Sequence, residues 1–209
     1  MPKKFISGLV IALFFCLFSV SASAFTFNLI YEFDGALPVQ NYGTVEVTQN
    51  GVDLDFVVEA DTATLGPEAD INELYFNLIN GFTGLSIVDN NAPNTDYEVI
   101  GPDPSVKGGA GASFDWGVDF GQGGGPPGNG ILQFATFTLS ADQPLLVSDL
   151  FEFSNPNNTP PVNVAVHFQS TDTPFDSEAV GGAVPIPAAA WLLGAGLLGL
   201  IGLRRRFRH

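Results

Sequence analysis

The chain has 209 residues, enough for one domain with flanking segments, and its apolar share of 45% together with a positive mean hydropathy argues against general disorder. It carries 22 acidic and 7 basic residues, and Lys107 is the only basic residue between Glu32 and Glu178, the segment that holds every acid. Such a segment repels phosphates and anionic lipid head groups, so the composition excludes nucleic acid as a partner.

Residues 1–24 have the three parts of a secretory signal. A basic start at Lys3 and Lys4 precedes an apolar run, and Ala24 closes an exit of small residues. The run is too short for a permanent membrane span. We therefore predict a signal helix that signal peptidase removes by cutting between Ala24 and Phe25. The single cysteine lies in this leader, so the mature protein is expected to have no disulfide.

From Phe25 on, apolar and polar residues alternate, which is typical of half-buried strands. The pattern predicts strands over residues 25–32, 44–48, 52–58, 74–79, 84–88, 131–139 and 162–168. Asn50 and Gly51 predict a tight hairpin turn with both residues at positive φ, within a hairpin of about residues 43–61. Val52 is expected to share the buried face of its strand with Phe56.

Short strands separated by loops rich in Gly, Pro, Asn and Asp, with no convincing amphipathic helix, predict an all-β domain over residues 25–170. We expect an antiparallel β-sandwich of two sheets, jelly-roll-like. The chain has 19 phenylalanines, and those in the predicted strands are expected to contribute core area. The polar segment 171–183, which holds Gly181 and Gly182, is predicted to be a flexible linker.

The sequence offers little catalytic chemistry. Apart from the C-terminal residue, His167 is the only histidine, and it occupies an outward position of a predicted strand. No Gly-x-Ser-x-Gly element supplies an exposed serine. We interpret His167 as a lone surface histidine and expect no catalytic residues and no enzyme activity.

Two sequence patterns match cofactor-binding motifs, but both lack the flanking features that such motifs require. Gly194, Gly196 and Gly199 match a dinucleotide-binding pattern, but they lie in an apolar segment with no preceding strand. The glycine-rich loop 121–130 lacks the lysine of a phosphate-binding loop. We therefore expect no cofactor.

Calcium is the alternative ion, because the loop from Asp89 to Asp96 supplies oxygen ligands in a turn-forming context. The loop lacks the glycine and the closing glutamate of the helix-flanked calcium loop. A solvated turn rich in Asp and Asn is the favoured interpretation, so no metal ligand is assigned.

The C-terminal segment has the sequence pattern of a membrane-spanning helix followed by a basic end. Residues 186–203 contain no charge and have the length of a bilayer-spanning helix, so we predict a single transmembrane helix there. Arg204, Arg205 and Arg206 follow directly. Basic residues stay cytoplasmic, which places the β domain outside the cytoplasm, in agreement with the leader.

This tail resembles the PEP-CTERM sorting signal of Gram-negative bacteria. The resemblance covers residues 184–209 and rests on Val184-Pro185-Ile186-Pro187, on the following Ala-Ala-Ala-Trp-Leu-Leu-Gly, and on the arginine triplet. Ile186 stands where the family has glutamate.

The resemblance implies recognition by an exosortase, a transpeptidase-like enzyme of the inner membrane, and cleavage near residues 185–187. It further implies transient anchoring in that membrane, then a place at the cell surface or outside the cell. Members of the family look associated with exopolysaccharide and biofilm, which makes extracellular polysaccharide an expected partner.

We therefore expect an exported, non-enzymatic surface or matrix protein. The alternative is a carbohydrate-binding module, with or without calcium, that uses Trp116, Tyr97 or Tyr42 as stacking platforms for sugar rings. An extracellular glycan hydrolase is the weakest candidate, because no catalytic constellation is recognisable.

Overall fold

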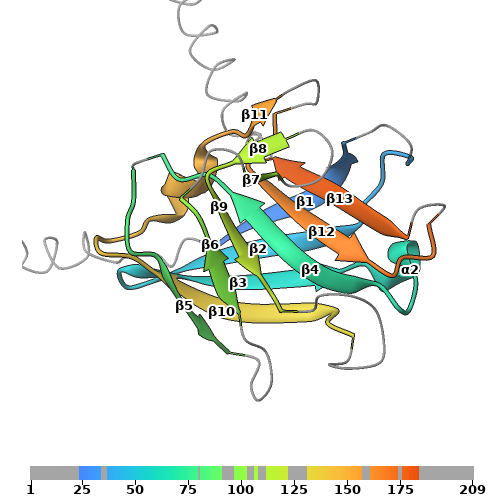
Figure 1. Cartoon of the computed structure of the whole chain (residues 1–209), viewed down its shortest axis with the longest axis horizontal. Helices are drawn as coiled ribbons and strands as arrows, with labels where there is room; N and C mark the ends of the chain where they lie inside the picture. Colours follow the sequence, from blue (N-terminus) through green and yellow to red (C-terminus); the bar gives the residue numbers. More distant parts are fainter. Residues whose placement is uncertain are drawn as a thin grey trace, which may run out of the picture.

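The computed structural model describes residues 24–33, 37–79, 81–90, 97–102, 106–107, 112–121, 131–156, 161–173 and 176–183 (Figure 1). Within these ranges the chain forms strands joined by short connections, one single-turn helix and one 3-10 helix. The elements are β1 (Ala24–Glu32), β2 (Gly43–Asn50), β3 (Asp53–Ala60), α2 (Thr62–Leu65), β4 (Asp70–Phe76), β5 (Ser86–Asp89), β6 (Glu98–Ile100), β7 (Val106–Lys107), β8 (Ala112–Phe114), β9 (Trp116–Asp119), β10 (Phe134–Ser140), η1 (Val147–Phe151), β11 (Asn155–Pro156), β12 (Val164–Gln169) and β13 (Ser177–Ala183).

Ten strands form one antiparallel sheet in the order β5-β10-β3-β2-β1-β13-β12-β4-β9-β6. The sheet curls until its edge strands β5 and β6 approach each other, which gives a nearly closed, barrel-like shape (Figure 1). A small sheet, in the order β11-β8-β7, stands beside this large one. Curling buries one face of every strand in a common interior, which is where the main core lies.

The prediction of an all-β fold is confirmed, but the two-sheet sandwich is wrong. Strands β5, β10, β3, β2 and β1 form one half of the order, and β12, β4, β9 and β6 form the other. Strand β13 pairs with β1 on one side and with β12 on the other, so it joins the halves into one sheet. Alternation in the sequence shows which face of a strand is buried, but it does not identify the neighbouring strand.

The predicted linker over residues 171–183 is also wrong in its second half, because Ser177–Ala183 is the bridging strand β13. Its glycines explain both the error and the structure. A Cβ atom on Gly181 would lie 2.8 Å from a methyl of Val162, and one on Gly182 would lie 3.0 Å from the carbonyl oxygen of Asn28. Glycine is needed where neighbouring groups approach this closely.

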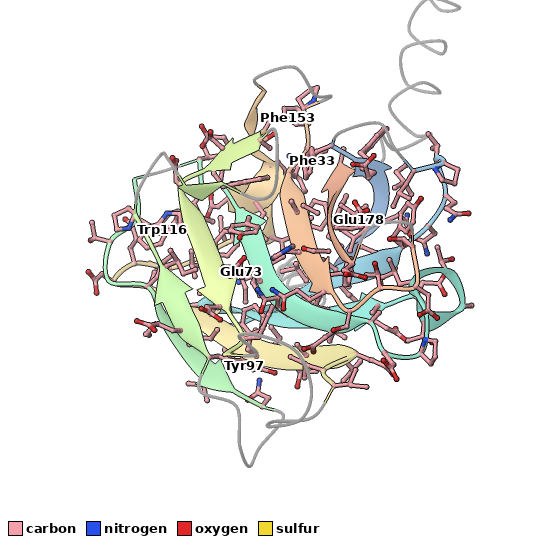
Figure 2. The ribbon with its side chains drawn as sticks, turned by 45° about the vertical axis from the view of Figure 1, so that its right-hand side comes forward. Phe33, Glu73, Tyr97, Trp116, Phe153 and Glu178 are labelled. Carbon is pink, nitrogen blue, oxygen red and sulfur yellow. The ribbon has the colours of Figure 1, made fainter. Side chains whose placement is uncertain are left out.

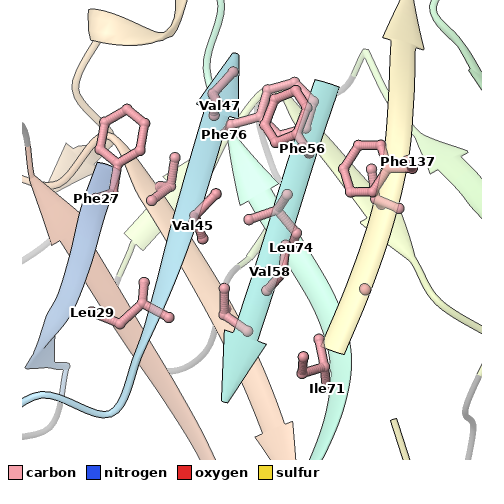
Figure 3. Packing of buried hydrophobic residues seen from close by; sticks show 14 of the residues in the cluster. Phe27, Leu29, Val45, Val47, Phe56, Val58, Ile71, Leu74, Phe76 and Phe137 are labelled. Carbon is pink, nitrogen blue, oxygen red and sulfur yellow. The ribbon is translucent and has the colours of Figure 1, made fainter. Parts of the chain in front are cut away.

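The main core fills the interior of the curled sheet with phenylalanine and aliphatic side chains (Figure 3). Phe56 of β3 stacks on Phe137 of β10, with ring centroids 4.8 Å apart and planes 7° apart. Phe56 also packs against Phe76 of β4, from the other half of the sheet, at 6.0 Å. The expected structural role of phenylalanine is therefore confirmed for these three residues.

A second, smaller core lies on the outer face of the large sheet. Its buried members are Phe33, Tyr75, Ala112, Phe114, Val162 and Ala165. Strand β1 shifts its register between Leu29 and Tyr31, and this irregularity turns Tyr31 toward the second core while Leu29 stays in the main one. Val162 also belongs here, although simple alternation predicts that it shares the inner face of β12 with Val164.

The predicted hairpin forms, with a different turn. Asn50 pairs with Asp53, so the two turn residues are Gly51 and Val52. Gly51 has φ of 63°, and Val52 does not have positive φ, which is the sign pattern of a type II′ turn rather than the type with two positive φ angles. Val52 is consequently exposed at the turn instead of sharing the buried face with Phe56.

No helix within the described ranges is long and apolar enough to cross a membrane. The predicted signal helix, except for Ala24 at the start of β1, and the predicted transmembrane helix over residues 186–203 lie outside those ranges. The same holds for the glycine-rich loop 122–130 and for most of the candidate calcium loop.

Candidate functional site

The most specific polar constellation lies on the outer face of β4, β12 and β13, where Glu73 is labelled in Figure 2. The imidazole of His167 is bonded on both sides. Its Nε2 lies 2.6 Å from the hydroxyl oxygen of Ser177, and its Nδ1 lies 3.1 Å from the carboxylate of Glu73. We call Ser177, His167 and Glu73 the relay cluster.

Strand pairing places these three side chains together. Glu73 lies directly opposite His167 across the β4–β12 pair. On the other side, His167 pairs with Ala179 and Gln169 pairs with Ser177, so the serine is the diagonal neighbour of the histidine on the same face. Neighbouring positions in a twisted sheet bring side chains into hydrogen-bonding reach even when they are remote in sequence.

A β-bulge adds a fourth group. The register between β4 and β12 shifts after His167, because Phe168 pairs with Ile71 and leaves Asn72 as the extra residue. The side-chain nitrogen of Asn72 lies 3.4 Å from Nδ1 of His167. The bulge therefore gives His167 two neighbours on β4, Asn72 and Glu73, where a regular strand would give it one.

Electrostatics fix the charge of Glu73. Its hydrogen bond with His167 lowers the pKa of Glu73, burial acts in the opposite direction, and a further hydrogen bond from the Tyr75 hydroxyl lowers the pKa again. Burial, followed by the neighbouring Glu73, raises the pKa of Tyr75, which keeps that hydroxyl protonated as a donor. Glu73 is thus held as a carboxylate that accepts two hydrogen bonds.

The carboxylate in turn selects the tautomer of His167. A proton on Nδ1 can be donated to Glu73, and this leaves Nε2 as an acceptor for the hydroxyl proton of Ser177. In this tautomer the amide nitrogen of Asn72 is a neighbour of Nδ1 and not a hydrogen-bond donor to it. The side-chain exposures are 21% for His167 and 23% for Glu73, and Ser177 is exposed. The arrangement therefore comprises a hydroxyl that solvent can reach, a base that accepts its proton, and a carboxylate that orients the base.

The interpretation of His167 as a lone surface histidine is accordingly wrong. One signal of the cluster is visible in the sequence, namely a histidine at an outward position of an apolar strand. Glu73 and Ser177 could not be singled out among the acids and serines of the chain. Their roles depend on the β4–β12–β13 order and on the bulge at Asn72, and neither is visible as a motif.

A second feature is a polar groove beside α2, lined by Asn41, Gly43, Thr44, Glu59, Ala60, Asp61, Thr62 and Ala63. Asp61 caps the helix, with its carboxylate accepting from the backbone N–H of Ala63. Thr44 and Glu59 face each other across the β2–β3 pair. Amide, hydroxyl and carboxylate groups of this kind can hydrogen-bond sugar hydroxyls, although the groove contains no aromatic platform.

The three aromatic residues predicted as stacking platforms are buried. Tyr42 is fully buried, and its hydroxyl donates to the carbonyl oxygen of Pro38 at 2.6 Å. Trp116 and Tyr97 are 4% and 9% exposed, and both belong to the main core (Figure 2). A carbohydrate module that stacks sugars on these residues is therefore ruled out.

The calcium and processing residues are only partly covered by the structure. The described ranges contain no group of three His, Cys, Asp or Glu side chains that could hold a metal ion. Ala24 and Phe25 begin β1, and Phe25 packs against Phe27 and Phe151. Val184, Pro185, Ile186, Pro187 and the three arginines lie outside the described residues, so their sorting role stays a prediction.

Comparisons with family models, with curated proteins and with solved structures find no match to this chain. Functional assignment therefore depends on the residues and their geometry.

Proposed function

We propose that this chain is an exported surface or matrix protein, delivered by a cleaved leader and by an exosortase-type enzyme that acts on Val184-Pro185-Ile186-Pro187. The sequence motifs of the two ends support the route. The host is then a Gram-negative bacterium, and the protein is anchored in the inner membrane only until the exosortase-type enzyme cleaves it. The surface role itself requires no catalysis.

One structural observation supports this proposal: within the described residues, the sheet extends from one predicted processing point to the other. Strand β1 starts at Ala24, and β13 ends at Ala183, the residue before the sorting motif. Every described core residue lies between Phe25 and Val180. Cleavage after Ala24 and cleavage near Pro185 therefore leave the core and the paired strands essentially complete.

The two ends also leave the sheet together. Strands β1 and β13 are antiparallel neighbours, and Ala183 pairs with Asn28, four residues after the start of β1. The first residue of β1 and the last residue of β13 consequently lie toward the same end of adjacent strands. Both membrane-directed segments can thus engage one membrane while the domain folds on its outer side.

Mass spectrometry of the protein recovered outside the host cell tests the route. We expect an N-terminus at Phe25 and loss of the residues after about Pro187. Replacing Pro185 and Pro187 together by alanine should retain the tail and keep the protein with the membrane. Pro161→Ala, in an exposed position of a described loop, is the matched control and should be processed normally. Extracellular wild-type protein with an intact tail would refute the sorting proposal.

Extracellular polysaccharide is the proposed partner at the destination, and the polar groove offers hydrogen-bonding groups for it. Affinity electrophoresis in the exopolysaccharide of the host, with and without EDTA, tests binding and metal dependence together. Retardation that Glu59→Gln weakens would support the groove as the contact. Migration unchanged by the polysaccharide would leave the protein as a matrix component without this ligand.

A further inference from the structure

We propose that Ser177 is a nucleophile activated by His167 and Glu73, and that it takes acyl groups from uncharged carboxylic esters. The site goes beyond the surface role proposed above and departs from the expectation of a protein without catalytic activity. That expectation depended on a histidine without partners, which the structure corrects.

The first argument for an activated serine comes from the distances between the three side chains of the relay cluster. A nucleophile and its base must lie within about 2.6 to 3.2 Å, and the base must be oriented by a third group. Ser177 Oγ and His167 Nε2 are 2.6 Å apart, and His167 Nδ1 and the Glu73 carboxylate are 3.1 Å apart. The hydroxyl and the carboxylate occupy opposite nitrogens of the ring, which is the order that proton transfer from serine requires.

The second argument is that the carboxylate that orients His167 is itself held in place by its neighbours. Glu73 accepts from the Tyr75 hydroxyl, and the Tyr75 ring is buried in the second core, where it stacks on Phe114. A rigid aromatic side chain therefore holds the carboxylate that holds the imidazole. Purely surface-exposed hydrogen bonds lack this anchoring and are readily exchanged with water.

Exposure defines the substrate. Ser177 lies at the exposed start of β13, next to the exposed Asp176 and on the same face as the Glu73 carboxylate, in a chain of net charge −15. A negatively charged ester is repelled from such a surface. An uncharged ester on a large molecule can reach an exposed serine, so short acyl esters carried by neutral polymers fit the site best.

The reaction balances with water as the second substrate. The Ser177 oxygen attacks the carbonyl carbon while its proton passes to His167 Nε2, and the tetrahedral intermediate expels the alcohol, which receives that proton. Water then attacks the acyl-serine, again giving its proton to Nε2, and the acid leaves as Ser177 recovers its hydrogen. No oxidant, reductant or metal takes part.

The test uses the full chain in detergent with an uncharged alkyl fluorophosphonate, which forms a bond between phosphorus and a nucleophilic serine as fluoride leaves. Peptide mass mapping should place one adduct on Ser177. General base catalysis contributes about 10²- to 10⁴-fold, so His167→Gln should slow labelling at least about 100-fold. Glu73→Gln is nearly isosteric and should also slow labelling. Release of p-nitrophenolate from p-nitrophenyl acetate should follow the same order.

Ser177→Ala should abolish the adduct, while Ser86→Ala, at an exposed serine of β5, should leave it unchanged. Thermal unfolding of each variant identifies any that is misfolded. If His167→Gln fails to fold, the labelling rate of Glu73→Gln provides the test. Absence of an adduct on wild-type Ser177, or labelling at the same rate in folded His167→Gln and Glu73→Gln, would overturn the proposal. Neither result affects the sorting route, which is tested by the termini of the mature protein.

Discussion

Phe56 is one of the residues through which the two halves of the sheet meet in the interior. It stacks on Phe137 from its own half and packs against Phe76 from the other, with 1% of its surface exposed. Removing the ring leaves a cavity that its neighbours, fixed on paired strands, cannot fill. Individual residues of this kind decide whether the curled sheet holds together.

Phe56→Ala should therefore lower the free energy of unfolding by about 3 to 5 kcal/mol, the usual cost of deleting a buried aromatic ring. Urea denaturation followed by tryptophan fluorescence measures the change. Phe134→Ala is the matched control, because Phe134 is 48% exposed on the neighbouring strand, and its cost should stay below about 1 kcal/mol. Equal losses in the two variants would contradict the assignment of Phe56 to the core.

Asp70 is a buried acid whose charge opposes folding. Its carboxylate accepts from the backbone N–H of Leu132 at 2.7 Å, but burial outweighs this bond and raises the pKa of Asp70. A raised folded pKa favours the protonated form, so the associated stability is present below the unfolded pKa and is lost as pH rises through the folded pKa.

Asp70→Asn keeps an oxygen acceptor for Leu132 and removes the buried charge. The variant should consequently be more stable than the wild type at pH 7, and the difference should shrink as pH falls toward the unfolded pKa of aspartate. Urea denaturation of both proteins at pH 7 and pH 4 provides the measurement. A difference that is constant with pH would show that the charge of Asp70 does not oppose folding.

Strand β13 has a sequence of low strand propensity, yet it occupies one of the two central positions of the large sheet. Ser-Glu-Ala-Val-Gly-Gly-Ala contains two glycines and few branched residues, so propensity predicts a linker. The structure needs those glycines, because Val162, Phe33 and the β1 backbone lie where a Cβ atom would be. Pairing with β1 on one side and β12 on the other therefore outweighs the low strand propensity of this segment.

Gly181→Ala should destabilise the protein by about 1 to 3 kcal/mol, as overpacking against the rigid, buried Val162 typically does. Gly81→Ala is the matched control, since nothing lies within 4 Å of its added methyl and its φ is not in the positive range. Its effect should be within about 0.5 kcal/mol. Differential scanning calorimetry of the wild type and the two variants measures these changes. Similar melting temperatures for both variants would refute the close approach at β13.

The strands and the hairpin could be predicted because alternation and turn residues are local signals, as β2, β3 and Gly51 show. The single sheet could not, since it depends on β13 pairing with β1 across most of the chain length. The relay cluster was missed for a related reason. Its members lie on three strands that only the full strand order makes neighbours, and the β4–β12 bulge sets their register.

At the scale of the whole molecule, closure of the sheet links stability to processing. Because β1 and β13 are adjacent, the first and last strands of the domain complete it together. A chain that lacks β13 leaves β1 and β12 with unpaired backbone groups in the middle of the sheet, each of which is costly when buried. The domain can therefore be complete only after residues up to about Ala183 have been synthesised.

Two truncated chains test this dependence. Residues 24–183 should fold alone and unfold cooperatively, because they contain every described strand and both cores. Residues 24–173, which lack only β13 and the three residues before it among those up to Ala183, should show no cooperative thermal transition by circular dichroism. Adding a synthetic peptide of residues 174–183 to the shorter chain should restore part of the transition through pairing with β1 and β12. Cooperative unfolding of residues 24–173 by themselves would show that the two halves of the strand order are stable without the strand that joins them.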